Sequence, residues 1–167
     1  LQIFGEIAAA DPKNIEARLD TAYAHQFMCR SLLILNDISG ALKSCREGIN
    51  IAEAMLSSDP KNYEAHHYIN INYHYITKTL EKITRYNDLI QALERWFALT
   101  EKMSADDSRT AESMYQHAVI AFQLGETYMI AASGAKLSAR KKIQHLQNSL
   151  DWFKRSQFLL QNLETSF

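Results

Sequence analysis

The residues best suited to chemistry are three histidines in the stretch EAHHYININYHY: His66, His67 and His74. His67 and His74 are seven residues apart, so a helix would place both side chains on one face. Zinc sites on helices use ligands three or four residues apart and add a carboxylate or a further ligand to complete the set. No such set is completed here. We therefore expect polar helix surface at these histidines, and neither a metal nor another cofactor.

The two cysteines, Cys29 and Cys45, are too few for a disulfide-rich scaffold or for a zinc site of four cysteines. On the helices predicted over 14–35 and 38–56, they face each other across one helical hairpin. We expect small buried thiols; a disulfide is the alternative if the domain lies outside the cytoplasm. A catalytic Cys–His pair has little support, because no histidine falls at the matching level of a neighbouring helix.

Charge and hydropathy exclude several classes of function. The 167 residues carry a net charge of −1, with acids and bases interspersed, so the basic stripe of a nucleic-acid-binding protein is missing. No apolar run approaches the roughly 18 residues that a membrane span needs, and the first residues do not resemble a signal peptide. The basic run SARKK at 138–142 predicts a solvated helix start, with a dock for an anionic peptide as the alternative.

These residues must be positioned by helices. The chain is 47% hydrophobic with only two prolines and five glycines, which favours long helices. Residues 38–56 place apolar side chains at steps of three and four, the period of one helical face. Related patterns predict helices over 14–35, 60–84, 89–103, 110–132 and 139–163. Four aromatic residues on these helices are expected to pack in the core or between repeats: Trp96, Phe97, Trp152 and Phe153.

A repeated stretch marks the junctions between helical pairs. ADPKNIEA at 10–17 returns as SDPKNYEA at 58–65, an offset of 48, and Asp107 follows Asp59 at the same offset. Each Asp-Pro is predicted to open a helix, with Asp as cap and Pro in the first turn. A second pair of similar segments occurs at the turns: NDISGAL at 36–42 and NDLIQAL at 87–93. Their offset is 51, which predicts a longer first helix in the second pair.

The pattern predicts an all-α fold: an α-solenoid, a right-handed superhelix of about three hairpins with long helices. We expect one domain over 1–167. Its hairpins cover 11–57, 58–104 and 105–167, the last with a longer inter-helix connection, and 1–10 end the helix of a preceding repeat. The chain is therefore expected to belong to a longer protein.

At these positions the sequence resembles tetratricopeptide (TPR) repeats, in which small residues and an aromatic allow two helices to approach closely. The third hairpin matches best, with Leu124-Gly125, Tyr128, Ser149, Phe153 and Ser156. Met28-Cys29, Leu32, Ala41, Cys45 and Gly48 take the same places in the first hairpin. The period of 48 exceeds the usual 34. The longer form, with openings such as ADPKNIEAR and the ending SLDWFKRSQFLLQNL, resembles the C-terminal repeats of bacterial eukaryotic-like serine/threonine protein kinases.

This resemblance implies a non-catalytic module for protein–protein interaction that recruits substrates or regulators or self-associates. The first helix of each TPR hairpin lines the concave face, which implies a partner-binding groove formed by Tyr23, Gln26, Arg30, His74, Thr77, Glu81, Phe122 and Glu126. The alternative is a ligand-sensing regulatory domain that binds a peptide or small molecule in this groove. The chain carries no kinase catalytic motif, so we expect no enzymatic activity from it. It is expected to be a soluble segment, either cytoplasmic or the extracytoplasmic part of a membrane-anchored kinase.

Overall fold

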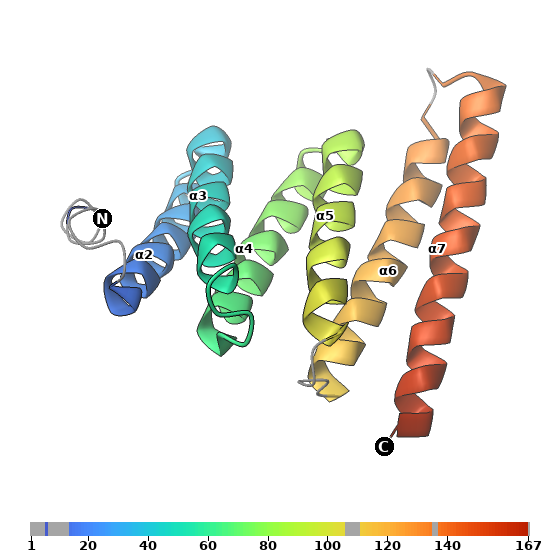
Figure 1. Cartoon of the computed structure of the whole chain (residues 1–167). Helices are drawn as coiled ribbons and strands as arrows, with labels where there is room; N and C mark the ends of the chain where they lie inside the picture. Colours follow the sequence, from blue (N-terminus) through green and yellow to red (C-terminus); the bar gives the residue numbers. More distant parts are fainter. Residues whose placement is uncertain (1–5, 7–13, 106–110, 135–136, 167) are drawn as a thin grey trace. The chain divides into compact units, whose positions relative to one another are not determined.

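The structure is a computed structural model that describes residues 6, 14–105, 111–134 and 137–166. Over these residues it is all-helical, with no strand, as the composition and the apolar periodicity predicted (Figure 1). The helices are α2 (Ile15–Ile34), α3 (Ile38–Leu56), α4 (Tyr63–Lys82), α5 (Tyr86–Ala105), α6 (Ala111–Ala132) and α7 (Ala139–Ser166).

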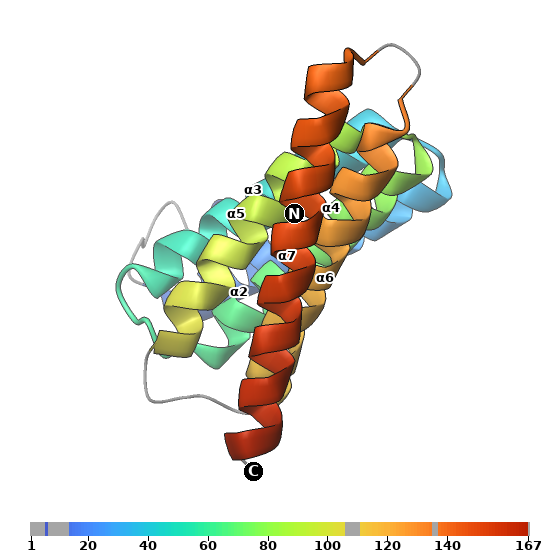
Figure 2. The same ribbon diagram turned by 90° about the vertical axis from the view of Figure 1, so that its right-hand side faces the viewer.

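The chain divides into two compact units, residues 1–79 and 80–167, with the division inside α4. In the first unit α2 and α3 form a hairpin, and Gly48 of α3 lies against Asn72 of α4. In the second unit α5 packs on α6, and α6 packs lengthwise on the long α7 (Figure 2). Neighbouring helices are therefore packed against one another within each unit.

The helices recur at a constant interval along the chain. α2, α4 and α6 begin at residues 15, 63 and 111, and α3 and α5 begin at residues 38 and 86. The turns agree, since Asn36 and Thr84 are separated by the same interval and both have left-handed backbones, with φ of 61° and 57°. The predicted offset of 51 for the second helix is therefore wrong. Asn87 and Asp88 do not match the turn residues of the first hairpin but lie in the first turn of α5, where Asp88 pairs with Arg85.

The repeated DPKN stretch starts a helix with its asparagine. Asn14 Oδ1 accepts a hydrogen bond from Ala17 N, and Asn62 Oδ1 accepts one from Ala65 N, both at 2.9 Å. The prediction that Asp-Pro opens the helix is wrong for the second copy. Asp59 instead forms a turn, in which its carboxylate accepts from Lys61 N and its carbonyl from Asn62 N. The first Asp-Pro, most of the predicted helix end at 1–10 and Asp107 lie outside the described residues.

Small residues bring α6 and α7 close together. A Cβ atom on Gly125 would lie 2.7 Å from the ring of Phe153, a separation that real side chains do not adopt. Two serines of α7 form buried hydrogen bonds to carbonyls of α6 and so complete the contact between the two helices, called the seam below. Ser149 donates to Gly125 O at 2.7 Å, and Ser156 donates to Ala118 O at 2.9 Å. The resemblance to TPR repeats singled out these residues as the close-packing positions of the third hairpin, and Ser149, Phe153 and Ser156 of α7 each contact α6.

A disulfide joins α2 to α3 between Cys29 and Cys45, and both residues are buried. The expectation of free thiols is therefore wrong, whereas their predicted placement opposite each other is correct. Cys29 precedes Gly125 by two periods of the repeat. The bond thus fills the place in the first hairpin that the contact between Gly125 and Phe153 fills in the third.

The expected aromatic core is present in the second unit. Trp96 and Phe97 are buried, which confirms their prediction. Trp152 is half-buried on α7 with its ring 4.8 Å from that of Phe97, and Phe153 is half-buried against Phe122 of α6. These contacts hold α5, α6 and α7 together.

Candidate functional site

Five of the eight predicted groove residues belong to the first unit. Tyr23 of α2 is 47% exposed, Arg30 is exposed and Gln26 is half-buried. On α4, His74 is exposed, whereas Thr77 is buried and its hydroxyl donates to His74 O at 3.1 Å. Thr77 therefore supports the helix backbone and does not offer its hydroxyl to solvent.

The other three predicted groove residues belong to the second unit. Glu81 and Glu126 are exposed at the end of α4 and on α6. Phe122 of α6 is also exposed, although one side of its ring lies 5.4 Å from the ring of Phe153.

The first unit carries a continuous row of rings, which we call the aromatic patch: Phe27, Tyr23, Tyr68, His67 and Tyr63. Its ring centroids lie 4.6 Å apart for Phe27 and Tyr23, and 6.1 Å apart for Tyr23 and Tyr68. They lie 6.0 Å apart for Tyr68 and His67, and 6.3 Å apart for His67 and Tyr63. The row therefore connects α2 to α4 without interruption.

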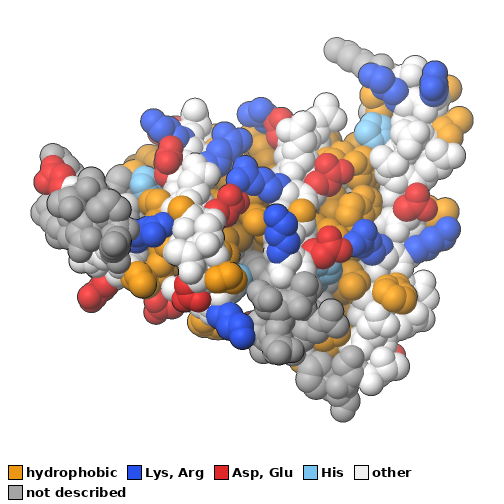
Figure 3. Space-filling model, in the orientation of Figure 1, with side chains coloured by type: hydrophobic (Ala, Val, Ile, Leu, Met, Phe, Trp, Pro, Cys, Tyr) orange, Lys and Arg blue, Asp and Glu red, His pale blue; other side chains and the backbone are white. Residues whose placement is uncertain are grey.

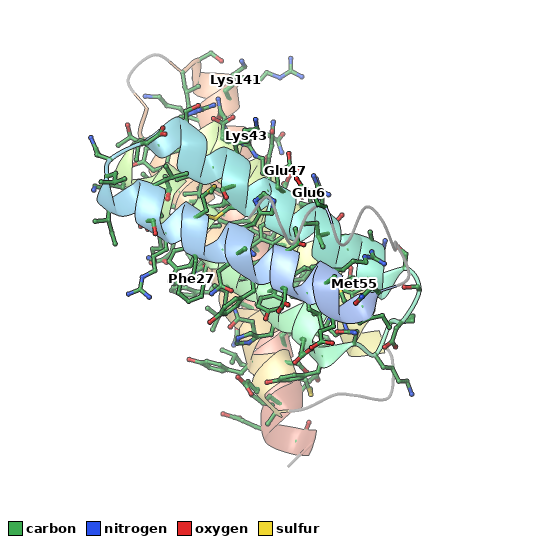
Figure 4. All side chains as sticks on the ribbon, turned by 90° about the vertical axis from the view of Figure 1, so that its left-hand side faces the viewer. Glu6, Phe27, Lys43, Glu47, Met55 and Lys141 are labelled. Atoms are coloured by element: carbon green, nitrogen blue, oxygen red, sulfur yellow. A yellow bond between two sulfur atoms is a disulfide. The ribbon has the colours of Figure 1, made fainter. Side chains whose placement is uncertain are left out.

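Helical spacing explains why these rings meet. Tyr23 and Phe27 are four residues apart, as are Tyr63 and His67, and side chains four apart lie on the same face of a helix. Phe27 is 46% exposed, and in Figure 4 it lies on the side of α2 away from Lys43 and Glu47 of α3. Tyr63 is more exposed still, so the patch is a surface feature and not part of the core.

Carboxylates flank the aromatic patch. Asp20 precedes Tyr23 by three residues on α2, and Glu64 precedes Tyr68 by four on α4; both are exposed. Burial raises the pKa of the Tyr68 phenol above its ordinary value of 10.0, and the charges of Glu64, Tyr23 and Asp20 raise this pKa further. The two carboxylates therefore act on the same ring from two different helices, and they make the surface around Tyr23 and Tyr68 negative.

A basic residue lies at the Phe27 end of the patch. Arg30 follows Phe27 by three residues on α2, so it lies on the same face, and it is exposed. Ten residues separate it from Asp20, which is about 15 Å along a helix at 1.5 Å per residue. The surface is therefore polarised along α2, from acidic to basic.

Sequence reasoning found only part of this patch. Tyr23 was expected in the groove, but Phe27, Tyr63 and Tyr68 were not among the predicted groove residues. The available signal was the spacing of four between Tyr23 and Phe27 and between Tyr63 and His67. That spacing shows which residues share a face, but it does not show whether a neighbouring helix covers them.

The histidines have structural partners. His66 Nε2 is 2.7 Å from the carbonyl oxygen of Pro60, His67 is part of the aromatic patch, and the ring of His74 lies 6.1 Å from that of Tyr75. Over the described residues no three His, Cys, Asp or Glu side chains converge on a point that could hold a metal ion. The histidine-rich stretch thus contributes to the surface of α4 and to the aromatic patch.

The most strongly shifted phenol lies in the second unit. Tyr128 is buried and donates a hydrogen bond to Glu94 Oε1 at 2.7 Å. Burial, this hydrogen bond and the Glu94 charge raise the pKa of Tyr128 to about 12. Such a phenol keeps its proton at neutral pH, and its hydrogen bond to Glu94 ties α5 to α6.

Acidic and basic side chains are interspersed on the surfaces of α3 and α5 (Figure 3). The basic run at 138–142 spans the start of α7, with Arg140 and Lys141 exposed to solvent as predicted. Among the helices described, none has the length and apolar character that crossing a bilayer requires. Comparison of the chain with protein-family models, with curated proteins and with solved structures found no match.

Proposed function

We propose that this chain is a non-catalytic interaction module that binds segments of partner proteins on the exposed faces of its first helices, α2, α4 and α6. One observation carries the proposal: these helices, which recur at a constant interval, expose large aromatic and apolar side chains beside polar ones, as α7 also does outside that interval. The residues concerned are Tyr23 and Phe27 on α2, Tyr63 on α4, and Tyr115, Phe122 and Met129 on α6.

Exposed side chains of this kind are suited to binding. Aromatic residues dominate the energetics of protein interfaces because they bury a large area while ordering few torsions. Contiguous exposed apolar groups usually mark interaction sites in soluble proteins. The constant interval between first helices adds support, because stacked repeats present equivalent helices along one surface. The α-solenoid and its TPR-like character are part of this proposal.

The sequence resemblance suggests a setting for such a module. If the chain follows a serine/threonine kinase domain, as the resemblance implies, its role is to recruit substrates or regulators to that kinase. Recruitment needs no chemistry from the module itself, and its two cysteines are joined and provide no free thiol nucleophile.

A peptide-display selection on the intact 167-residue chain tests the proposal. We expect enriched peptides to bind wild-type protein with micromolar dissociation constants. Their binding should fall when Tyr23 and Phe27, or Phe122 and Met129, are replaced by serine. Replacing Ile143 and Leu150 of α7, which are equally exposed, is the matched control and should leave binding unchanged. A selection without enriched peptides, or peptides that bind all variants equally, would refute the proposal.

A further inference from the structure

We propose that the aromatic patch on α2 and α4 is the docking site for an arginine side chain carried by an exposed segment of a partner protein. This inference rests on the proposed function and adds the chemistry of the partner. It follows from three features of the first unit: the arrangement of the rings, the carboxylates beside them, and the exposure of both.

The rings are arranged to receive a flat cation. Tyr23 is the central ring, inclined by 63° to Phe27 and by 60° to Tyr68. Aromatic faces carry negative electrostatic potential, so a cation within about 6 Å of a ring centroid is attracted. The three neighbouring rings are inclined to one another, and Tyr23 and Phe27 are each about half exposed, so a cation can approach them from solvent.

The charge around the rings selects a cation. Asp20 and Glu64 flank the patch from its two helices, and both act on the phenol of Tyr68. The nearest basic residue on the exposed face of α2, Arg30, lies at the opposite end. A partner cation placed over Tyr23 therefore lies near two carboxylates, while Arg30 can meet an acidic group elsewhere on the same partner segment.

The second unit of the same chain contains an arginine that is already held by aromatic rings and a carboxylate. The guanidinium of Arg155 lies 4.6 Å from the centroid of Phe97 and 5.6 Å from that of Trp152. Its Nη2 bonds Glu101 Oε1 at 2.5 Å. Two rings and one carboxylate thus hold one arginine. In the first unit, three rings of the aromatic patch (Phe27, Tyr23 and Tyr68) and the two flanking carboxylates offer the same groups.

Arginine fits this surface better than lysine does. The guanidinium is planar, stacks on aromatic faces and bonds a carboxylate through two parallel N–H groups. An ammonium is a strongly hydrated point charge that gains less from a flat ring. The partner segment is therefore expected to be a protein segment with an exposed arginine and an acidic residue further along.

Titration of the ¹⁵N-labelled intact chain with the hexapeptide acetyl-(Gly-Arg)₃-amide tests the inference. We expect amide shift changes at residues 16–27 and 63–68. Tyr23→Leu should weaken binding by about fivefold or more, because it removes a ring but keeps an apolar surface, and Tyr23→Phe should keep the affinity within about twofold. Asp20→Asn should also weaken binding and reduce its salt dependence.

Matched controls and competing probes complete the test. Phe158→Leu and Asp151→Asn, at exposed positions on α7, should leave affinity unchanged. Equal affinity for the Gly-Lys or Gly-Glu hexapeptide, equal binding of tetramethylammonium at the same residues, or no effect of Tyr23→Leu would each overturn the inference. Display-selected peptides that bind the patch without arginine would overturn it as well, while the interaction module would stand.

Discussion

At the level of single residues, His117 is the buried titratable group with the most consequences. It is 4% exposed on α6, with its ring 4.0 Å from that of Phe97 and its Nδ1 3.0 Å from the Thr100 hydroxyl of α5. Burial lowers the pKa of His117 below 6.5, Glu101 of α5 opposes this shift, and Arg155 of α7 adds to it. Burial also lowers the pKa of His25 in the first unit.

Stability should therefore fall in mild acid. Because the unfolded chain binds a proton at His117 near pH 6.5 and the folded chain does so only at lower pH, the free energy of unfolding is highest above pH 6.5. It should decrease as the pH falls from 6.5 toward the lowered pKa. Urea unfolding at pH 7.5 and at pH 5.5 measures this change. His117→Gln, which cannot titrate, should show a smaller decrease, and an identical decrease would assign the acid sensitivity to other groups.

The Cys29–Cys45 disulfide should contribute strongly to the stability of the first hairpin. It closes a loop with a sequence separation of 16, and loops of this size contribute about 3 kcal/mol by restricting the unfolded chain. Reduction with dithiothreitol should lower the free energy of unfolding by about 3 kcal/mol. The intact mass should rise by the mass of two hydrogen atoms. In the double variant Cys29→Ala, Cys45→Ala the reductant should have no effect. Free thiols in protein isolated under non-reducing conditions would contradict the bond.

At the level of helices, the asparagine of each DPKN stretch caps the start of α2 or α4. Asn62→Ala should lower the unfolding free energy by about 1 kcal/mol, because it removes the side-chain acceptor of the Ala65 N–H. Asn62→Asp keeps an acceptor and should retain most of the stability. Lys61→Ala, at an exposed neighbouring position, is the control. Chemical denaturation gives the free energy of unfolding of the three variants. An Asn62→Ala variant as stable as the wild type would contradict the role of Asn62 as a cap.

The seam between α6 and α7 should not accept a larger residue at Gly125. Gly125→Leu should cost about 1–3 kcal/mol by overpacking, because even a Cβ atom would meet the Phe153 ring. Phe153→Ala removes this obstacle, so the double variant should be more stable than the sum of the two single changes predicts. Additive effects in thermal unfolding would show that the two residues do not interact.

The sequence predicted the helices well because their apolar periodicity is a local property. All six predicted ranges correspond to helices, with ends that agree within a few residues. The pairs Cys29 with Cys45 and Gly125 with Phe153 lie where the resemblance to TPR repeats placed them. The start of α5 was predicted three residues too late. Asn87-Asp88 has the same residue types as Asn36-Asp37, but it lies in the first turn of a helix and not in the turn between two helices. The aromatic patch was mostly missed because it depends on which rings of α2 and α4 stay uncovered, and that is set by tertiary packing.

At the level of the whole molecule, the regular recurrence of the helices is the organising feature. The three first helices begin at residues 15, 63 and 111, which are evenly spaced. Repeats of this kind bury their apolar faces on their neighbours while leaving one series of helices to bind partners. The two exposed faces described here, on α2 with α4 and on α6, each lie on first helices. The central claim is that these faces, and not those of α3, α5 and α7, bind protein segments.

Mapping of a display-selected peptide on the ¹⁵N-labelled intact chain tests this claim most directly. We predict saturable amide shift changes confined to exposed positions of α2, α4 and α6, led by the residues around Tyr23 and Phe27 or around Phe122. Shift changes centred on the outer faces of α3, α5 or α7, for example around Lys43 or Leu146, would contradict it.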